Sequence, residues 1–140
     1  MSMDVTNILN KLNPQQEIAV TSDCPHLLVL AGAGSGKTRI LVHRIAWKIQ
    51  VNNAPSHGIL AVTFTNKAAR EMKERIDKLL KIPAQGMWVG TFHGLAHRLL
   101  RSHWRDADLA EDFQILDSED QLRLVKRLMR TLDLDEQRWP

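Results

Sequence analysis

The sequence predicts an α/β protein in which a parallel sheet is flanked by helices. Three short apolar runs suited to strands, at residues 26–31, 59–64 and 87–89, are each followed by a segment whose apolar residues have helical spacing. Alternation of this kind is typical of a parallel sheet with right-handed crossovers. No further strand of this kind follows residue 105, so we expect a separate helical region there.

The elements before residue 51 follow from a cap and an apolar run. Asn13-Pro14 predicts the start of a helix that runs to about residue 20, with Asn as the N-cap and Pro at the first helical position. The run His26–Ala31 is apolar and bounded by Pro and Gly, which predicts a strand covered on both faces. A helix is expected from Gly36 to about Gln50.

The next fifty residues repeat the strand and helix pattern. A loop at 52–58 leads to a predicted buried strand, Ile59–Phe64, and Asn66 is expected to cap the helix that follows. A short strand, Met87–Val89, precedes another helix. The apolar residues that predict the two helices are Ala69, Met72, Ile76 and Leu79 in the first, and Phe92, Leu95, Ala96, Leu99 and Leu100 in the second.

The last third of the chain is acidic and helical in pattern. Asp117 or Ser118 is expected to cap a helix. Its apolar residues are Leu122, Val125, Leu128, Met129 and Leu132. We place a boundary near residues 91–105, so that residues 1–91 form the first part of the sheet domain and residues 92–140 begin a helical subdomain.

Charge and composition limit the possible classes of function. Residues 37–105 carry 13 basic and three acidic side chains, whereas residues 106–140 carry five basic and ten acidic ones. A basic middle segment favours a polyanionic partner such as nucleic acid, although solvated helix faces also explain part of it. No apolar run approaches the roughly 20 residues that cross a membrane. A single cysteine excludes an internal disulfide and suits a reducing, cytoplasmic location.

A phosphate loop is the most informative motif. The pattern small-x-x-x-x-Gly-Lys-Thr predicts backbone N–H groups turned towards phosphates, with a helix N-terminus adding its positive dipole end. Lys37 is expected to reach the β- and γ-phosphates, and the Thr38 hydroxyl is expected to ligate Mg²⁺. The first position is Ala instead of the usual Gly, a minor departure. The motif comprises Ala31, Gly32, Ala33, Gly34, Ser35, Gly36, Lys37 and Thr38.

The loop identifies a nucleotide without identifying a reaction. Asn66-Lys67 begins the guanine-reading pattern Asn-Lys-x-Asp, but Ala69 stands where the Asp is required. The loop also lacks the Pro that is usual in small-molecule kinases of the adenylate type. ATP is favoured by elimination.

Three further segments accompany the loop in a fixed order. They are "LNPQQEIAV" upstream, and "AVTFTNKAAREM" and "GMWVGTFHGLAHRLLR" downstream. With the loop, they resemble the Q-motif and motifs I, Ia and Ib of superfamily-one DNA helicases of the UvrD/Rep/PcrA group. The tail "FQILDSEDQLRLVKRL" is similar to the same group, so the resemblance covers essentially the whole chain. It implies a partial RecA-like domain, called 1A in this group, followed by the start of an inserted subdomain, 1B.

The resemblance also implies roles for individual residues. Gln16 and Arg39 would contact the adenine, although Gln16 also suits a capping box with Asn13 and Arg39 suits a solvated helix. Phe64 would stack on a base in the single-strand channel, with a core phenylalanine as the alternative. The other residues implied to contact DNA are Thr65, Asn66, Thr91, Phe92 and His93. His93 and His97 lie four apart, but a metal site needs more ligands.

The resemblance implies a function for the parent protein and a limit for this chain. The parent would be an ATP- and Mg²⁺-dependent helicase moving 3′ to 5′ on single-stranded and partly duplex DNA, working with DNA-repair proteins. Hydrolysis also needs a Mg²⁺-ordering Asp and a water-polarising Glu after a buried strand. Asp135-Glu136 follows an interrupted apolar run, so we interpret it as unrelated. We therefore expect an N-terminal piece that lacks hydrolysis, with a non-hydrolysing nucleotide- or DNA-binding module as the alternative.

Overall fold

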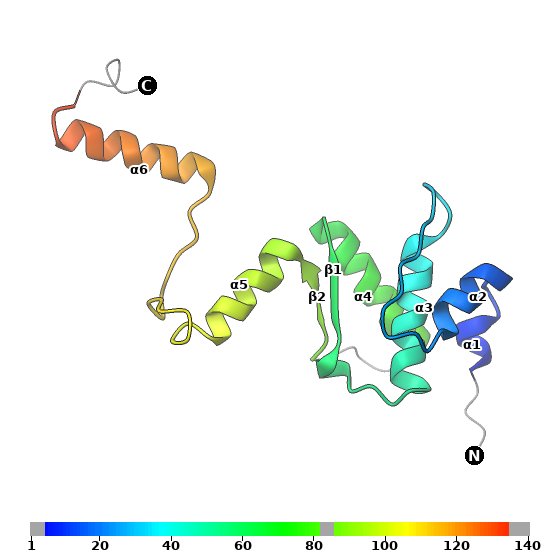
Figure 1. Ribbon diagram of the computed structural model, residues 1–140. Coiled ribbons are helices and arrows are strands. Elements are labelled where there is room, and N and C mark those ends of the chain that lie inside the picture. Colours follow the sequence, from blue (N-terminus) through cyan, green and yellow to red (C-terminus); the bar gives the residue numbers. More distant parts are fainter. Residues whose placement is uncertain (1–4, 82–85, 135–140) are drawn as a thin grey trace. The chain divides into compact units, whose positions relative to one another are not determined.

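The computed structural model describes residues 5–81 and 86–134 of the chain. They fall in two compact units, Met1–Leu99 and Leu100–Pro140. The first unit is a mixed α/β structure with a small parallel sheet (Figure 1). Within the described residues no helix is both long and apolar enough to cross a membrane.

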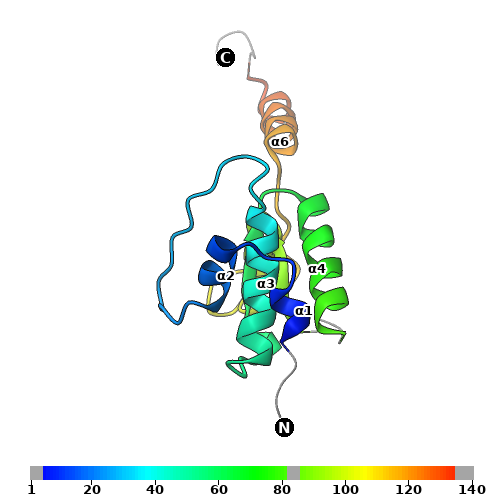
Figure 2. The same ribbon diagram turned by 90° about the vertical axis from the view of Figure 1, so that its right-hand side faces the viewer.

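The N-terminal helices pack around α3. Helices α2 (Pro14–Thr21) and α4 (Asn66–Leu80) lie on opposite sides of α3 (Lys37–Gln50), as both ribbon views show (Figures 1 and 2). The single-turn helix α1 (Thr6–Leu9) also packs against α3. Asn13 caps α2 and Pro14 opens it, as the sequence predicts. Helix α3 begins at Lys37, one residue later than expected, because Gly36 adopts a left-handed conformation as its N-cap.

A βαβ unit supplies the sheet. Strand β1 (Leu60–Thr63) is joined through α4 to β2 (Trp88–Thr91), and the two strands pair in parallel with Thr63 opposite Thr91. A short 3₁₀ turn, η1 (Ser56–Gly58), precedes β1. The parallel pairing of these two segments is confirmed, with bounds shifted by about one residue. Of the four β1 residues only Ala61 is buried, so the prediction of a buried strand there is only partly right.

The predicted strand at His26–Ala31 does not form. The segment is irregular, and its side chains Leu28 and Leu30 are 82% and 87% exposed. A strand is held by hydrogen bonds to a neighbour and by cover on its faces, and in the described residues β1 and β2 pair only with each other. Apolar side chains are therefore not sufficient to make this segment a strand. It forms a loop that runs outside the helices before it reaches α3 (Figure 2).

Two apolar clusters hold the first unit together. Between α3, α4 and the sheet lie Val42, Ile45, Ala61, Met72, Ile76 and Met87. Between α1, α2 and α3 lie Ile8, Val20, Ile40 and Ala46. Helix α3 contributes to both clusters, so it is the central element of this unit.

Helix α5 (Phe92–Ser102) starts directly after β2, with no connecting residue. Leu95 of α5 is buried and packs closely on the sheet, since a Cβ on Gly90 would lie 3.0 Å from its Cγ. The guanidinium of Arg98 stacks over the Trp88 ring at 4.3 Å. These contacts hold α5 against β2.

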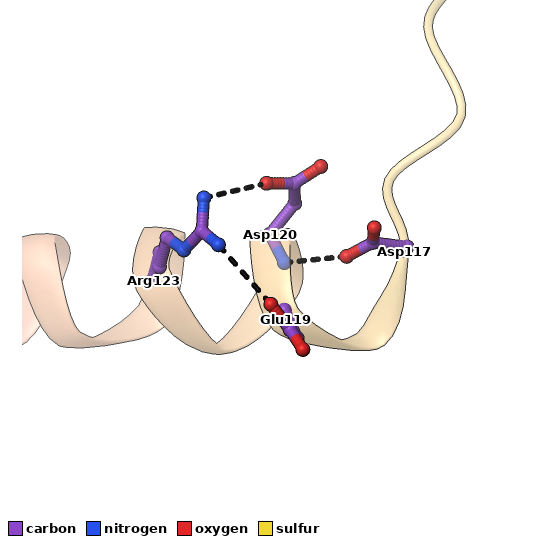
Figure 3. Close-up of polar contacts among 4 residues, drawn as sticks. All are labelled: Asp117, Glu119, Asp120 and Arg123. Carbon is purple, nitrogen blue, oxygen red and sulfur yellow. Dashed lines mark hydrogen bonds and ion pairs between the residues drawn. The ribbon is translucent and has the colours of Figure 1, made fainter.

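The second unit contains α6 (Ser118–Thr131). Asp117 is its N-cap, and the carboxylate accepts a hydrogen bond from the Asp120 N–H at 2.8 Å (Figure 3). Arg123 bonds Glu119 and Asp120 on the first turns. Before α6, the Arg101 guanidinium donates to the carbonyls of Glu111 and Phe113. The predicted apolar side of α6, including Leu122 and Leu128, is solvent-exposed.

Candidate functional site

The phosphate loop turns sharply through its glycines. Gly34 and Gly36 have φ angles of +75° and +89°, which L-residues with a side chain rarely adopt. An added Cβ would meet no atom within 4 Å at Gly32 or Gly34, so the space beside both is open. Because α3 begins at Lys37, the unpaired N–H groups of its first turn lie at the end of this loop. This combination of free donors and open space suits an anion.

Lys37 folds back over the loop. Its ammonium donates to the carbonyls of Ala31 at 3.0 Å and Gly32 at 2.8 Å. The Ser35 hydroxyl donates to the same Gly32 carbonyl at 2.7 Å. Lys37 is solvent-exposed, so these bonds can be exchanged for bonds to a ligand. Thr38 follows in the first turn of α3 and is also exposed.

Gln16 joins α2 to the phosphate loop. Its Oε1 accepts from the Asn13 N–H at 3.2 Å, and its own N–H donates to the Asn13 side chain at 2.9 Å, which completes a capping box. Its Nε2 donates to the Ser35 carbonyl at 3.0 Å. The capping role and a place beside the loop therefore coexist in one side chain.

Arg39 lies elsewhere. Its guanidinium donates to the Lys11 carbonyl at 3.4 Å and lines a cavity between α1, α3 and α4. The cavity beside the phosphate loop, of about 590 Å³, is lined by Gln16, Gly32 and Ser35 but not by Arg39. The structure thus brings Gln16 together with the loop and leaves Arg39 on another side of α3.

A second group of predicted residues gathers where the two strands end. Phe64 and Phe92 directly follow the paired residues Thr63 and Thr91. Their ring centroids lie 5.7 Å apart with an interplanar angle of 49°. Phe64 is 90% exposed and Phe92 is 58% exposed, so the core alternative for Phe64 is wrong in this chain. Two neighbouring exposed rings form a surface on which a planar group can stack.

The polar residues of this group act first as caps. The Thr65 hydroxyl accepts from the Ala68 N–H at 3.1 Å, so Thr65, and not the predicted Asn66, is the N-cap of α4. Asn66 is the first helical residue. The Thr91 hydroxyl accepts from the Gly94 N–H at 3.2 Å. Both hydroxyls thereby stay at the edge of the sheet where the strands end, and His93 is exposed beside them on the first turn of α5.

Metal ligands do not cluster in the part of the chain that the structure describes. No group of three His, Cys, Asp or Glu side chains there could hold an ion, and His93 with His97 forms no such group. Asp135-Glu136 lies outside the described residues.

Arg44 is a positioning residue that the sequence analysis missed. Its guanidinium donates to the carbonyls of Ala19 at 2.9 Å and Ser22 at 3.0 Å, at the end of α2. It also reaches the carbonyl of Cys24 at 3.4 Å. A cation at a helix C-terminus is favourable. Arg44 lies more than 20 residues from the end of α2 in sequence, so no local sequence pattern predicts this contact. Arg44 fixes the point from which the chain leaves for the phosphate loop.

Comparison with known proteins gives a consistent family match. Residues 12–140 match the family described as the UvrD/REP helicase N-terminal domain. The chain is 63% identical over 138 residues to DNA helicase II of Escherichia coli K12, with 99% of this chain and 19% of the relative covered. It is 46% identical over 133 residues to the ATP-dependent DNA helicase PcrA of Bacillus subtilis, with 94% and 18% covered. The chain spans about a fifth of the length of these curated relatives.

Proposed function

Because the chain belongs to the UvrD/REP helicase family, we propose that it is the nucleotide-gripping N-terminal part of an ATP-dependent DNA helicase. In this proposal residues 1–91 are the first part of a RecA-like domain, 1A, and residues 92–140 begin the inserted subdomain, 1B. The whole protein translocates 3′ to 5′ along single-stranded DNA, opens partly duplex DNA in the cytoplasm, and works with DNA-repair proteins. This chain alone does not hydrolyse ATP.

The single observation that carries the proposal is the joined Q-motif and phosphate loop. Gln16 bonds Ser35 within the loop, and the Gly36 turn aims the first turn of α3 at the same place. Among nucleotides, this arrangement suits one with a phosphate chain at the loop and a base near α2. A cavity of about 590 Å³, in the size range of small-molecule sites, lies between α2 and residues 27–32 at the start of the loop.

Each loop residue has a proposed task with ATP·Mg²⁺. Lys37 exchanges its bonds to the Ala31 and Gly32 carbonyls for bonds to the β- and γ-phosphates. The exposed Thr38 hydroxyl is a ligand for Mg²⁺, which neutralises phosphate charge when bound. The backbone N–H groups of residues 32–38 hold the remaining phosphate oxygens. Gln16 reads the adenine edge, and Arg39 turns from the Lys11 carbonyl towards the base.

The proposed DNA track begins at the exposed phenylalanine pair. A base stacks on Phe64, and Phe92, the first residue of α5, supports that ring. Thr65, Asn66, Thr91 and His93 surround the pair at the strand ends, where open α/β sheets bind their ligands. Stacking is independent of base identity, which suits an enzyme that moves along any sequence.

The test is single-strand-stimulated ATP hydrolysis, measured side by side for this 140-residue chain and for the full-length gene product. The proposal predicts stimulated turnover by the full-length product, and ATP binding without turnover by this chain. Turnover by this chain would show that Asp135-Glu136 or another group acts as the hydrolytic pair. Absence of turnover from both would favour a non-hydrolysing nucleotide- or DNA-binding module.

A further inference from the structure

The basic side chains that the structure describes after residue 105 all lie on α6. They are Arg123, Lys126, Arg127 and Arg130, and all four are exposed. Residues three, four and seven positions apart share one face of an α-helix, so these four form a single row, which we call the basic stripe. Together with Thr131 they line a cavity of about 530 Å³, and no Asp or Glu of the described residues lines it. We infer that the basic stripe binds the phosphate backbone of duplex DNA.

The acidic side chains of α6 offset the basic stripe only in part. The helix carries four basic and two acidic side chains. Glu119 and Asp120, in the first turn, pair with Arg123 at 3.1 and 3.4 Å (Figure 3). The Arg123 side chain is 72% exposed, and an exposed pair contributes little, so phosphate oxygens can replace these carboxylates. No Asp or Glu occurs at residues 121–132, so positive charge dominates the rest of the helix.

The helix dipole explains only the end of the basic stripe. A cation is favoured within the last turn of a helix, which accounts for Arg130. The effect falls off beyond that turn, so it does not account for Arg123 or Lys126. A surface lined by one sign of charge raises the local concentration of ions of the opposite sign. The row therefore suits a partner whose own negative charges are arranged in a line.

The length of the basic stripe matches a nucleic-acid backbone. Arg123 and Arg130 are seven residues apart, which is about 10 Å along an α-helix. The phosphates of one duplex strand recur about every 3.4 Å along the duplex axis, so about three of them fall within this length. The cations of the stripe can therefore contact consecutive phosphates from one face of α6.

Duplex DNA fits the basic stripe better than single-stranded DNA does. Helix α6 contains no aromatic residue, whereas proteins that hold single strands combine basic grooves with rings on which bases stack. The exposed rings of Phe64 and Phe92 offer such a surface in the first unit. In a duplex the bases already stack on one another, so an exposed row of cations meets the phosphates. The inference rests on the proposed function, in which the protein opens partly duplex DNA.

An anionic membrane surface is the competing partner. The side of α6 opposite the basic stripe carries Leu122, Val125 and Leu128, which are exposed. Basic amphipathic helices with this pattern also bind membrane surfaces. The match to a family of DNA helicases favours DNA, and the test includes both partners.

The test is DNA binding by the full-length gene product carrying Lys126→Gln with Arg127→Gln. Glutamine keeps a high helix propensity and removes the two charges. The probes are a blunt-ended duplex, a thymidine oligonucleotide and phosphatidylglycerol vesicles, each titrated at several salt concentrations. Near 0.1 M salt the duplex affinity should fall about tenfold or more, and the slope of log K against log salt should fall in magnitude by about 1.8, because each phosphate contact contributes about 0.9. The affinity for the thymidine oligonucleotide should stay close to wild type.

The matched control is Arg70→Gln with Lys73→Gln. It also removes one Arg and one Lys, from exposed positions of α4. An equal loss of duplex affinity in this control would reduce the effect to net charge and overturn the inference. An unchanged salt slope, or an equal loss of single-strand affinity, would overturn it too. Vesicle binding that depends on the basic stripe, without duplex binding, would assign α6 to a membrane surface instead.

Failure of this inference and failure of the proposed function give different results. The proposed function is tested on the wild-type protein, by single-strand-stimulated ATP hydrolysis. A wild-type protein that hydrolyses ATP, with a duplex affinity that does not depend on the basic stripe, would overturn the inference alone. A wild-type protein that neither hydrolyses ATP nor binds single-stranded DNA would overturn the proposed function.

Discussion

The side-chain amide of Gln16 donates to the backbone carbonyl of Ser35 over 3.0 Å, although 19 residues separate them in sequence. The same side chain accepts a hydrogen bond from Asn13 at the start of α2. One amide group therefore joins the capping box of a helix to the centre of the phosphate loop. The amide nitrogen of Gln16 donates to the loop and the amide oxygen accepts from the helix cap, so a substitution can remove one hydrogen bond and keep the other.

Gln16→Glu is expected to keep the capping box and lose the loop contact, because a carboxylate accepts from Asn13 but cannot donate to Ser35. Its thermal stability should remain close to wild type while its affinity for ATP falls. Gln16→Ala loses both interactions and should also be less stable, by about 1 kcal/mol. Thermal unfolding and equilibrium ATP binding measure the two effects. Wild-type ATP affinity in Gln16→Glu would contradict the proposed role of this amide.

Lys37→Ala is expected to abolish ATP binding by the loop and to leave the fold intact. The lysine bonds only exposed loop carbonyls, so water can replace it there. With ATP, it supplies a charge-assisted contact that water cannot. Circular dichroism and ATP titration test the two halves of this prediction, with Lys73→Ala on α4 as the charge-matched control. ATP affinity unchanged from that control would disprove the phosphate-loop assignment.

Gly36→Ala is expected to destabilise the first unit by about 1–2 kcal/mol. Its φ of +89° is unfavourable for alanine, and the new Cβ would lie 3.0 Å from Nε2 of Gln16. Gly32→Ala is the comparison, because its Cβ would meet no atom within 4 Å. Urea unfolding of both variants should show a loss only at Gly36. Equal stability of the two variants would mean that the left-handed turn is not required.

Phe64→Ala is expected to weaken single-stranded DNA binding by about 1–3 kcal/mol without lowering the melting temperature. The ring is 90% exposed, so little apolar burial is lost. Phe64→Trp should retain affinity because indole also stacks, and Leu60→Ala, at the start of the preceding strand β1, controls for loss of an exposed apolar group. Fluorescence anisotropy with a labelled oligonucleotide measures affinity. A lower melting temperature with unchanged affinity would assign Phe64 a packing role.

Asp117→Ala is expected to destabilise α6 by about 1 kcal/mol, because the first-turn N–H of Asp120 loses its acceptor (Figure 3). Asp117→Asn should preserve the helix, since asparagine caps as well as aspartate does. The exposed Arg123 pairs with Glu119 and Asp120 contribute little and do not compensate. Hydrogen exchange of the first-turn amides measures the difference. Equal exchange in the two variants would contradict a capping role.

Local signals predicted helices α2 to α6, although not the single-turn helix α1, and long-range contacts determined the strands. Asn13-Pro14 and Asp117 identified two helix starts because a cap depends on residues within one turn. The strand expected at 26–31 was wrong because a strand depends on a partner that composition cannot supply. Thr65 and Asn66 are both suitable N-caps, so local sequence does not distinguish them. In the structure Thr65 keeps an extended backbone after β1 and is the N-cap of α4.

Within the candidate site, the motifs identified candidate residues but did not predict what each one bonds, and Arg39 lies apart from Gln16 and the loop. The stacking of Phe64 with Phe92 follows from parallel strands that end at the same level; the sequence predicted the parallel pairing but not the contact between the two rings. The bond from Arg39 to Lys11 and the anchoring of α2 by Arg44 depend on side-chain reach across packed helices. Such reach has no periodicity in the sequence, so neither contact could be predicted.

The direct passage from β2 into α5 makes the chain sensitive to length at that point. An α-helix turns about 100° per residue, so one residue inserted between Thr91 and Phe92 would rotate every side chain of α5 by that angle relative to the sheet. Leu95 would leave its place against Gly90, and the ring at the strand end would no longer face Phe64. The exposed residues Asn52 and Asn53 lie in a loop after α3, where an added residue would disturb the bond from the Ala54 N–H to the Lys48 carbonyl but would not rotate the face of a helix. Chain length is therefore constrained more strictly at the β2–α5 junction than in that loop.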